Sequence, residues 1–516
     1  MTLKELLQGC DVINAFLPLE KKITHIAYDS RKVDDGCLFV AIKGEKFDGH
    51  DFISEAVRKG ATAVVGEKNM EDLKSTYIRV KDSRKALACI THNFYGMPSE
   101  HLTLIGITGT NGKTTTTYIL KSILECWGKA VGLIGTINYM IRKKIYPAPH
   151  TTPESLEFHG LLKDMLSSGC THVISEVSSH ALEQHRVDRA SFKVAIFTNL
   201  TRDHLDFHKT MENYFRAKER LFRELLGKDG ASVINFDDPY GKRLLMELES
   251  ASGERDPEAK RILTYGLEEG ADIVAREIHT SSEGVKFKIS FRSRTYDISS
   301  PLMGLPNVYN ILSAAGASIS LGVPWQVILD GISKTGSVRG RFEKVDIGQN
   351  FLCVIDYAHT EDALERLIFT AREFIKDSPG SIQPRIITVF GCGGDRDRGK
   401  RPRMGAVATR LSDFVILTSD NPRSEDPSDI IREIESGAVK SNYVKESDRR
   451  EAIRKAVSLA CEKDIILIAG KGHEDYQEIR GKRYPCNDRE ILEDLIKDKL
   501  RIPERNENSG CMGVRR

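Results

Sequence analysis

The sequence lacks long hydrophobic runs and any marked imbalance of charge. Its 516 residues carry 76 basic and 74 acidic side chains, for a formal net charge of +2, a balance that does not predict a nucleic-acid-binding protein. Apolar runs such as residues 465–469 have the length of a strand, and the N-terminal stretch MTLKELLQGC has no basic segment leading into an apolar one. The sequence therefore predicts neither a transmembrane helix nor a signal peptide, and we expect a cytoplasmic protein without a membrane partner.

Cysteine pairing motifs are also missing. The ten cysteines are scattered without any C-x-x-C pair, and Cys353 lies inside the apolar run FLCVID, where a free thiol packs as a small hydrophobic group. The pattern predicts neither disulfides nor a zinc site. The overall composition, 40% hydrophobic and 29% charged, is typical of a globular protein. The length exceeds that of one hydrophobic core and indicates about three domains.

The stretch LIGITGTNGKTTTT organises the chain, because an apolar run breaks there into a glycine-bearing loop followed by hydroxyl residues. Gly109 and Gly112 let backbone N–H groups approach anionic oxygens, Lys113 supplies a positive charge, and Thr114 can reach a magnesium ion. The strict phosphate-loop pattern requires glycine where this chain has Ile107, and a glycine-rich turn alone is often only a turn. Strand, loop, lysine and threonine are nevertheless in register, which favours a relative of the P-loop that binds a nucleotide triphosphate.

The first segment, residues 1–97, is predicted to form a small α/β domain. Residues 52–57 have helical spacing, Gly60 stands at a C-cap position, and residues 61–65 resume an extended apolar run. Ser30, in the turn DSR, can bind the polar head of a ligand, but residues in such turns are mostly structural.

The second segment, residues 98–337, is expected to form a mostly parallel sheet around the phosphate loop. The strand HVISEV brings Glu176 to its carboxyl end, where a carboxylate can hold Mg²⁺, although a single Glu on a strand is more often a surface residue. The motif NLTRDHLDFH gathers titratable groups, including His204 and His208, in a set that suits phosphate or magnesium better than zinc. By pattern alone, Lys218 in the amphipathic stretch YFRAKERLF is a solvated helix lysine.

Two further polar pairs precede helical patterns in this segment. Thr151 and Thr152 stand before a helix-like stretch that starts at Glu154, and their hydroxyls can simply cap that helix. Asn307 and Asn310 lie near the start of another helix, where a side-chain amide can either read a nucleotide base or act as a cap.

The third segment, residues 338–502, has three strands that each end in a polar loop: RIITVF before GCGGDRDRG, DFVILT before SDNPRSEDP, and DIILIAG before KGHEDYQ. In an open parallel sheet, ligands bind beyond the carboxyl ends of the strands, so we expect these loops to converge. Arg396 and Arg423 can bind a carboxylate, while Asp420 and Glu474 can accept hydrogen bonds from an ammonium group. Each loop alone is common, but together they predict a pocket for a zwitterionic amino acid.

Three more residues of this segment are candidates for the nucleotide site. Arg341 in GRFE, and Asp356 and His359 in DYAHT, would face the nucleotide if the third domain closes over the second. The tail, residues 503–516, is expected to be unordered.

The motifs TGTNGKTT, EVSSHAL, NLTRDHLDFH, GRFE and DYAHT, in this order over almost the whole chain, resemble the Mur ligases, which build the peptide of bacterial cell-wall precursors. The HTTP, DSR and FDGH turns and the run AGKGHEDYQ are similar to those of the members that extend UDP-N-acetylmuramoyl-L-alanyl-D-glutamate by a third residue, and DNPR points to meso-diaminopimelate. The resemblance implies three α/β domains: a UDP-binding domain over residues 1–97, a central P-loop-type ATPase domain over residues 98–337, and a Rossmann-like amino-acid-binding domain over residues 338–502.

The resemblance also implies specific site residues. ATP would contact Gly109, Thr110, Asn111, Gly112, Lys113, Thr114, Thr115, Asn307, Arg341, Asp356 and His359. The muramoyl dipeptide would contact Ser30, Thr151, Thr152, Ser178, Gln184 and Arg186, and diaminopimelate would contact Arg396, Asp420, Asn421, Pro422, Arg423, Gly470 and Glu474. The catalytic residues would be Lys113, Lys218 and His204, and the magnesium ligands would be Thr114, Glu176 and a Lys218 carbamylated by CO₂. One departure is Glu361, which stands where the family usually has proline.

The implied reaction starts with attack of the glutamyl carboxylate on the γ-phosphoryl group of ATP, with Mg²⁺, and ends with attack of the amino acid on the acyl phosphate. The expected partners are these small molecules, without nucleic acid, and the expected state is a monomer. Arg423 favours diaminopimelate over lysine, because lysine lacks the second carboxylate. The alternatives are the lysine-adding relative, a ligase similar to folylpolyglutamate synthase, and a non-catalytic protein in which ATP only closes the domains.

Overall fold

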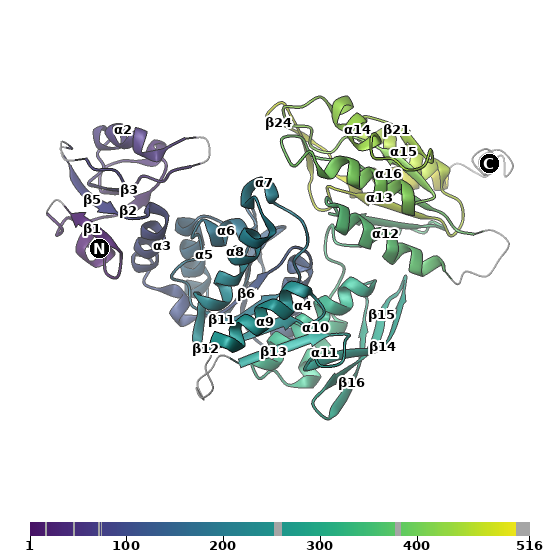
Figure 1. The fold of residues 1–516 in the computed structure, drawn as a ribbon, viewed down its shortest axis with the longest axis horizontal. Coiled ribbons are helices and arrows are strands. Elements are labelled where there is room, and N and C mark those ends of the chain that lie inside the picture. Colours follow the sequence, from purple (N-terminus) through teal and green to yellow (C-terminus); the bar gives the residue numbers. More distant parts are fainter. Residues whose placement is uncertain are drawn as a thin grey trace.

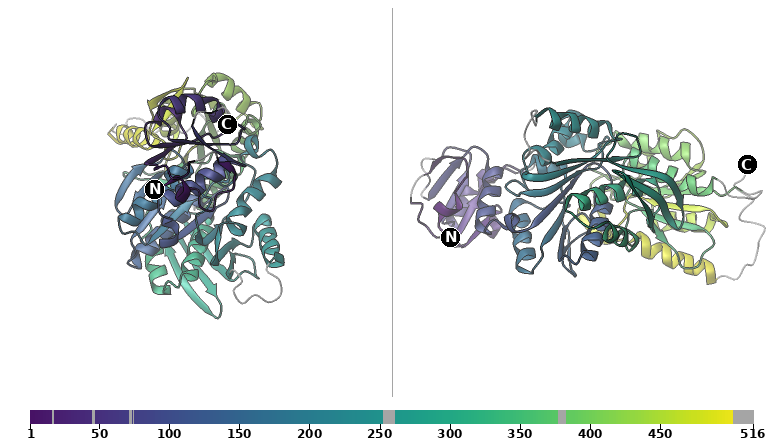
Figure 2. Two further views of the ribbon diagram at one scale, coloured as in Figure 1. Left: turned by 90° about the vertical axis from the view of Figure 1, so that its left-hand side faces the viewer. Right: turned by 90° about the horizontal axis from the view of Figure 1, so that it is seen from below.

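A computed structural model shows three α/β domains in a row, with the central domain between the other two (Figures 1 and 2). The predicted fold class, with mostly parallel sheets, is confirmed, whereas the boundaries after residues 97 and 337 stay predictions. The predicted unordered tail lies outside the described residues. The structure describes residues 1–15, 18–44, 47–70, 73, 75–251, 261–376 and 383–501.

The N-terminal domain is a five-stranded sheet in the order β1-β5-β4-β3-β2, parallel except for the pair β1 and β5. Buried residues of α1 and α3 pack on one face and those of α2 on the other, and the predicted helix and strand around Gly60 are confirmed as α2 and β4. The elements are α1 (Leu3–Leu6), β1 (Val12–Ala15), β2 (His25–Ala27), β3 (Cys37–Val40), α2 (Ile53–Arg58), β4 (Ala63–Gly66), β5 (Thr76–Val80) and α3 (Ser83–Phe94).

The central domain contains an eleven-stranded sheet in the order β16-β15-β14-β13-β12-β11-β6-β10-β7-β8-β9. Its middle strands, from β14 to β7, are parallel, and an antiparallel hairpin extends each edge. The strands are β6 (Thr103–Thr108), β7 (Val131–Ile134), β8 (Asn138–Ile141), β9 (Lys144–Pro147), β10 (His172–Glu176), β11 (Phe192–Phe197), β12 (Leu226–Asn235), β13 (Arg261–Gly266), β14 (Ile273–Ser281), β15 (Gly284–Phe291) and β16 (Arg294–Ser300).

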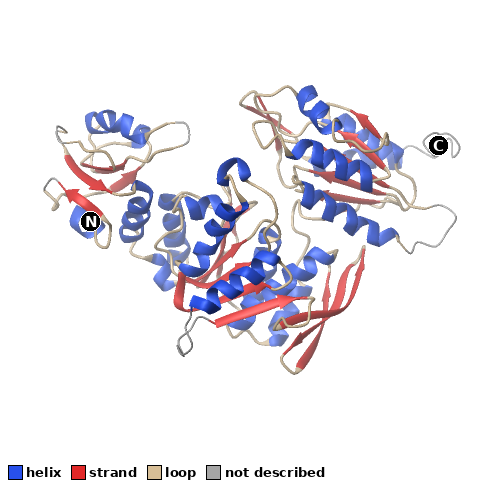
Figure 3. Ribbon diagram, in the orientation of Figure 1, coloured by secondary structure: helices blue, strands red, loops and turns tan. Residues whose placement is uncertain are grey.

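Helices cover both faces of this central sheet (Figure 3). Apolar residues of α4, α10 and α11 form the core on one face, and those of α5, α6, α8 and α9 form the core on the other. Because β6 is a central strand of the sheet, the phosphate loop that follows it lies near the middle of the sheet, beyond the carboxyl ends of the parallel strands. The helices are α4 (Lys113–Cys126), α5 (Ser155–Ser167), α6 (Ser179–Glu183), α7 (Leu205–His208), α8 (Met211–Arg223), α9 (Pro239–Ala251), α10 (Leu305–Ser320) and α11 (Trp325–Ser333).

The C-terminal domain has a six-stranded sheet in the order β17-β18-β22-β19-β20-β21, parallel except for β17. The three strands predicted to converge are β19, β20 and β22, and β19 pairs with both of the others. The elements are β17 (Glu343–Val345), β18 (Leu352–Asp356), α12 (Glu361–Ile375), β19 (Ile386–Phe390), α13 (Lys400–Leu411), β20 (Phe414–Leu417), α14 (Pro427–Glu435), β21 (Tyr443–Lys445), α15 (Arg449–Leu459), β22 (Ile465–Ala469), β23 (Tyr476–Ile479), β24 (Lys482–Pro485) and α16 (Asp488–Arg501).

Two general expectations can be compared with this fold. Among the described residues, no helix combines the length and the apolar character that crossing a membrane requires. The prediction of no disulfides is wrong at Cys461, which is disulfide-bonded, because spacing along the sequence does not report which thiols meet in space.

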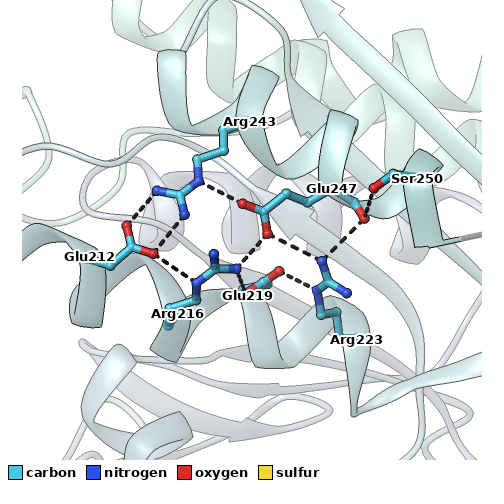
Figure 4. Close-up of polar contacts among 7 residues, drawn as sticks. All are labelled: Glu212, Arg216, Glu219, Arg223, Arg243, Glu247 and Ser250. Carbon is cyan, nitrogen blue, oxygen red and sulfur yellow. Dashed lines mark hydrogen bonds and ion pairs between the residues drawn. The ribbon is translucent and has the colours of Figure 1, made fainter.

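A charged network joins α8 to α9 on the outside of the central domain (Figure 4). Glu247 of α9 accepts hydrogen bonds from Arg216 at 2.6 Å and from Arg243 at 2.8 Å. Arg243 also binds Glu212 through two nitrogens, at 2.6 and 2.7 Å, and Arg216 binds the nearly buried Glu219 at 2.7 Å. This network holds the outer face of α8 against α9.

We expect the substitution Glu247→Gln to lower the free energy of unfolding by about 1 kcal/mol at neutral pH and low salt, because solvent screens most of each pair. Partial burial opposes ionisation, but hydrogen bonds from Arg243 and Arg216 hold the pKa of Glu247 at about 2, against an ordinary 4.5. This stabilisation is complete above pH 4.5 and is lost as the pH falls from there toward about 2. Urea denaturation of both proteins at decreasing pH checks this. If the difference in stability between the two proteins does not shrink below pH 4.5, it does not come from the ion pairs of Glu247.

Candidate active site

The phosphate loop has the conformation that its glycines predict. It connects the end of β6 to Lys113, the first residue of α4. Gly109 and Gly112 have positive φ angles of 142° and 87°, and a Cβ atom on Gly109 would lie 1.9 Å from the hydroxyl oxygen of Thr198, so this position requires glycine. The loop therefore points the N-terminal N–H groups of α4 into a cavity, an arrangement that favours bound anionic oxygens.

Two lysines meet beneath this loop. The amine of Lys113 donates to the carbonyls of Gly109 and Thr110 at 2.9 Å each, and the amine of Lys218 donates to the Gly109 carbonyl at 2.8 Å. Burial lowers the pKa of Lys113, and burial together with the Lys113 charge lowers the pKa of Lys218 well below its ordinary value. Lys218 is only 1% exposed, so the pattern-based prediction of a solvated helix lysine is wrong. Lys218 lies on the buried side of α8, together with the apolar residues that pack in the core.

Oxygen atoms that could bind a cation gather around Glu176, next to the phosphate loop. The hydroxyl of Thr114 donates to Glu176 at 2.9 Å, and Thr136 donates to the same carboxylate through its backbone N–H at 2.8 Å and its hydroxyl at 2.9 Å. Glu176 ends β10 and is 1% exposed, which excludes the surface interpretation. The sequence reasoning missed Thr136, although its place two residues after the apolar strand β7 was a usable signal.

Thr114 and Glu176 offer a hydroxyl and a carboxylate, the hard oxygen donors that Mg²⁺ prefers. Within the part of the chain that the structure describes, no three His, Cys, Asp or Glu side chains form a metal-binding cluster. The donor set around the phosphate loop thus fits a magnesium ion that keeps water and phosphate ligands, and it does not fit zinc.

The C-terminal domain forms the other wall of this first cavity, whose volume is about 670 Å³. Arg341 donates to the Thr114 hydroxyl at 3.3 Å. Asp356 accepts two backbone N–H groups at 2.7 and 2.8 Å, and burial raises its pKa. The predicted ATP and metal residues in the lining are Thr110, Asn111, Gly112, Lys113, Thr114, Thr115, Glu176, Asn307, Arg341, Asp356 and His359.

A second cavity, of about 660 Å³, lies beyond the carboxyl ends of the three converging strands. Its lining carries both signs of charge, as predicted. Arg423 donates to the Gly394 carbonyl at 2.7 Å and lies 3.4 Å from Glu478, while the Asn421 amide donates to Glu474 at 2.7 Å. The predicted residues that line this cavity are Arg396, Asp420, Asn421, Arg423, Gly470 and Glu474.

The two cavities share part of their walls. Asp203, His204, Tyr357 and His359 line both of them. Burial lowers the pKa of His204 to about 3 and also lowers the pKa of His359, so both rings are neutral at physiological pH. Groups bound in the two cavities would be adjacent at this shared wall. Tyr357 was missed from the sequence, although it lies between two predicted residues.

The predicted dipeptide-binding residues are only partly brought together. Thr151 and Ser178 line the first cavity, and the buried Thr152 donates to the Glu176 carbonyl at 2.7 Å. The capping hypothesis for both threonines is wrong, because α5 has Glu154 as its N-cap without a side-chain hydrogen bond. Instead, the Thr151 hydroxyl lies 3.1 Å from the hydroxyl of Thr136, and the Thr152 hydroxyl is hydrogen-bonded to Glu176 at the end of β10.

Other predicted residues lie outside the linings of both cavities. Arg186 donates to the Thr152 carbonyl at 3.0 Å and to Gln184 at 2.6 Å, next to the first cavity. Ser30 is buried in the N-terminal domain, where its hydroxyl lies 3.4 Å from Glu55. Residues of the predicted set that line neither cavity are Ser30, Gly109, Thr152, Gln184, Arg186, Lys218 and Pro422.

Glu361, which stands where the family usually has proline, does not disturb the start of α12. Thr360 caps α12 by accepting the N–H of Ala363 at 3.3 Å, which makes Glu361 the first helical residue. Proline favours that position because its missing N–H has no intrahelical partner there, and a carboxylate favours it because of the helix dipole. The side chain also pairs with Arg403 at 3.4 Å, so the start of α12 is kept.

Three family domains match most of the chain: the Mur ligase family catalytic domain over residues 22–95, the Mur ligase middle domain over residues 107–318, and the Mur ligase glutamate ligase domain over residues 340–472. A Clostridium botulinum protein named UDP-N-acetylmuramoyl-L-alanyl-D-glutamate--2,6-diaminopimelate ligase is 48% identical over 486 residues, which cover 93% of this chain and 96% of that protein. The chain belongs to the Mur ligase family. The resemblance inferred from the motifs is thereby confirmed.

Solved structures share the fold of this Mur ligase over nearly its full length. A structure of a UDP-N-acetylmuramoyl-L-alanyl-D-glutamate--2,6-diaminopimelate ligase has 32% identity and a TM-score of 0.68, and the match covers 97% of this chain and 99% of that one. The MurF ligase from Thermotoga maritima in complex with ADP has 20% identity and a TM-score of 0.60, over 93% and 98% of the two chains. The second likeness shows the fold alone.

Proposed function

We propose that this Mur ligase uses ATP to join meso-2,6-diaminopimelate to the glutamyl carboxylate of UDP-N-acetylmuramoyl-L-alanyl-D-glutamate. The observation that carries the proposal is the wall shared by the phosphate-loop cavity and the mixed-charge cavity. An enzyme that activates a carboxylate with phosphate and then transfers it to an amine needs these two sites side by side. The names of the relatives agree with this substrate pair.

Phosphorylation is needed because a carboxylate attacked directly by an amine would have to expel oxide. In the proposed first step, the glutamyl carboxylate attacks the γ-phosphorus of ATP, ADP leaves, and an acyl phosphate forms. Lys113 and the N-terminal N–H groups of α4 would stabilise the charge on the transferred oxygens. A magnesium ion held by Thr114 and Glu176 would add Lewis-acid stabilisation of the same charge.

Lys218 fits the proposed carbamate. Burial and the neighbouring Lys113 charge lower the pKa of its amine and so raise the fraction of neutral amine, and only a neutral amine can add to CO₂. The resulting carbamate is anionic, so it would replace the repulsion between Lys218 and Lys113 by attraction. It would also add oxygen donors beside Thr114 and Glu176, whereas the amine offers none to a cation.

The second step is attack of the amino-acid nitrogen on the acyl phosphate, with phosphate as the leaving group. Asp420 and Glu474 would orient the amino acid in the second cavity through its ammonium group. The proton lost by the attacking nitrogen would pass toward the carboxylate of Asp203, which lies 3.3 Å from the Nε2 atom of His204. Closure of the C-terminal domain over the phosphate loop would exclude water, which otherwise hydrolyses the acyl phosphate.

The proposal is tested by measuring phosphate release from ATP with the UDP-linked dipeptide and meso-diaminopimelate, L-lysine or no amino acid. We expect turnover and an amide product of the correct mass with diaminopimelate only. Equal or faster turnover with lysine would assign the chain to the lysine-adding relatives. Phosphate release independent of any acceptor, without an amide product, would favour the nucleotide-driven binding protein. Location in the cytoplasm and a monomeric state stay predictions.

A further inference from the structure

We propose that Asp362 is a positioning residue that couples the C-terminal domain to the phosphate loop. It lies in the first turn of α12, and α12 lies at the side of the C-terminal domain that faces the central domain (Figure 1). One oxygen of its carboxylate accepts the side-chain amide of Asn111 at 3.0 Å and the hydroxyl of Thr201 at 3.1 Å. The other oxygen accepts the Nε–H of Arg366 at 3.0 Å. The inference rests on the proposed use of the phosphate loop for ATP.

The residue that Asp362 holds is at the tip of the phosphate loop. The backbone N–H of Asn111 donates to the side chain of Asn199 at 2.9 Å, and its carbonyl accepts the Thr198 hydroxyl at 2.7 Å. Both partners follow β11 in the central domain, so the backbone of Asn111 is fixed from within its own domain. Its side-chain amide is left for Asp362, which reaches it from a separate domain 251 residues along the chain.

The second hydrogen bond of Asp362, from Thr201, ties the contact between the domains to one domain arrangement. The backbone N–H of Thr201 donates to the Thr110 hydroxyl at 3.0 Å, so Thr201 is itself part of the support of the loop. A single carboxylate therefore binds both the loop and the segment that supports it. Bonds to a charged acceptor are stronger than those between neutral groups, and they form only when α12 stands over the loop.

The position of Asp362 distinguishes it from the substrate-binding residues. Asn111, Thr201 and Arg366 line the first cavity, whereas Asp362 is absent from the lining of either cavity. Its side chain is 26% exposed and paired with Arg366. Asp362 thus acts on the reaction through Asn111 and through the placement of α12. Its loss should misplace the acyl phosphate relative to the incoming amine, with little effect on nucleotide binding.

The test compares Asp362→Ala with Glu361→Ala. Glu361 is the adjacent carboxylate in the same helical turn, but it pairs with Arg403 on the surface of its own domain. We expect Asp362→Ala to lower kcat about 10- to 100-fold, because small misplacements of reacting groups have effects of this size, and to leave the dissociation constant of ADP within about threefold. The ratio of phosphate released to amide formed should rise above one, since water reaches an incompletely covered acyl phosphate. Glu361→Ala should keep the ratio and the rate of the unmodified protein.

A readout without substrates separates this inference from the proposed reaction. Hydrogen exchange of the ligand-free protein should be faster in Asp362→Ala for peptides containing Asn111 and Thr201, and unchanged in Glu361→Ala. The isosteric variant Asp362→Asn keeps an acceptor oxygen and should restore part of the rate and of the protection. Unchanged exchange together with an unchanged product ratio in Asp362→Ala would overturn the inference. If the unmodified protein forms no amide, the proposed reaction fails, and the exchange measurement still decides the role of Asp362.

Discussion

Replacing Lys218 with methionine is expected to lower the rate of amide formation about a thousandfold, which is the effect of removing a group that stabilises transition-state charge in a buried site. Lys218 is 1% exposed, its amine is hydrogen-bonded to the phosphate loop, and its carbamate would supply oxygen ligands to magnesium. Methionine fills a similar volume and carries no buried amine. We therefore expect the melting temperature to stay equal or to rise, so that lost activity cannot be attributed to unfolding.

Two measurements check the assignment of Lys218. With ¹³C-labelled bicarbonate, NMR should detect a carbamate carbon in the unmodified protein and none in Lys218→Met, and buffer depleted of CO₂ should lower the activity of the unmodified protein. Lys121→Met is a suitable control, because Lys121 lies on α4 and pairs with Glu125 at 2.8 Å outside the cavity lining. Activity of Lys218→Met within about tenfold of the unmodified protein would contradict a role in stabilising charge.

Replacing Arg423 with alanine is expected to lower kcat/KM for meso-diaminopimelate about a thousandfold, in line with the roughly 3 to 5 kcal/mol that removing one partner of a buried pair costs. Arg423 lines the second cavity. Its backbone N–H donates to the Glu478 carbonyl of β23 at 2.9 Å, and its carbonyl accepts the N–H of Arg480, the residue after β23, at 2.7 Å. That pairing holds the residue in a left-handed conformation with φ of 50°. The guanidinium is thereby directed at the cavity and at the Gly394 carbonyl. Activity with L-lysine, which lacks the second carboxylate, should change little.

The preference for diaminopimelate over lysine is thus the quantity to measure for Arg423→Ala. Arg480→Ala provides the matched control, because Arg480 has the same charge, lies in the β23–β24 hairpin against which the backbone of Arg423 pairs, is exposed, and does not line the cavity. It should retain both the rate and the preference. An Arg423→Ala protein that still prefers diaminopimelate by about a thousandfold would assign the selection to another residue, with Arg396 as the remaining predicted cation of the cavity.

Much of the architecture was predictable because it depends on local patterns. The apolar runs at β6, β10, β19, β20 and β22 are buried strands, each bounded by a polar loop, and parallel strands place such loops at one edge of a sheet. For this reason the phosphate loop, Glu176 and the loop of Asp420 could be assigned from the sequence. Helix α8 was predicted as amphipathic, but the period of its apolar residues could not decide how deeply Lys218 lies within the core.

The sequence by itself determined the fold class, the phosphate loop and the family, since these depend on the order of short motifs and on the alternation of apolar and polar residues. Only the tertiary structure decided that Lys218 lies beneath Gly109, that Thr136 completes the Glu176 site, and that Asp362 reaches Asn111. Each of these contacts joins segments that are far apart in the chain. They arise from the packing of separate elements and domains, which the local pattern of residues does not encode.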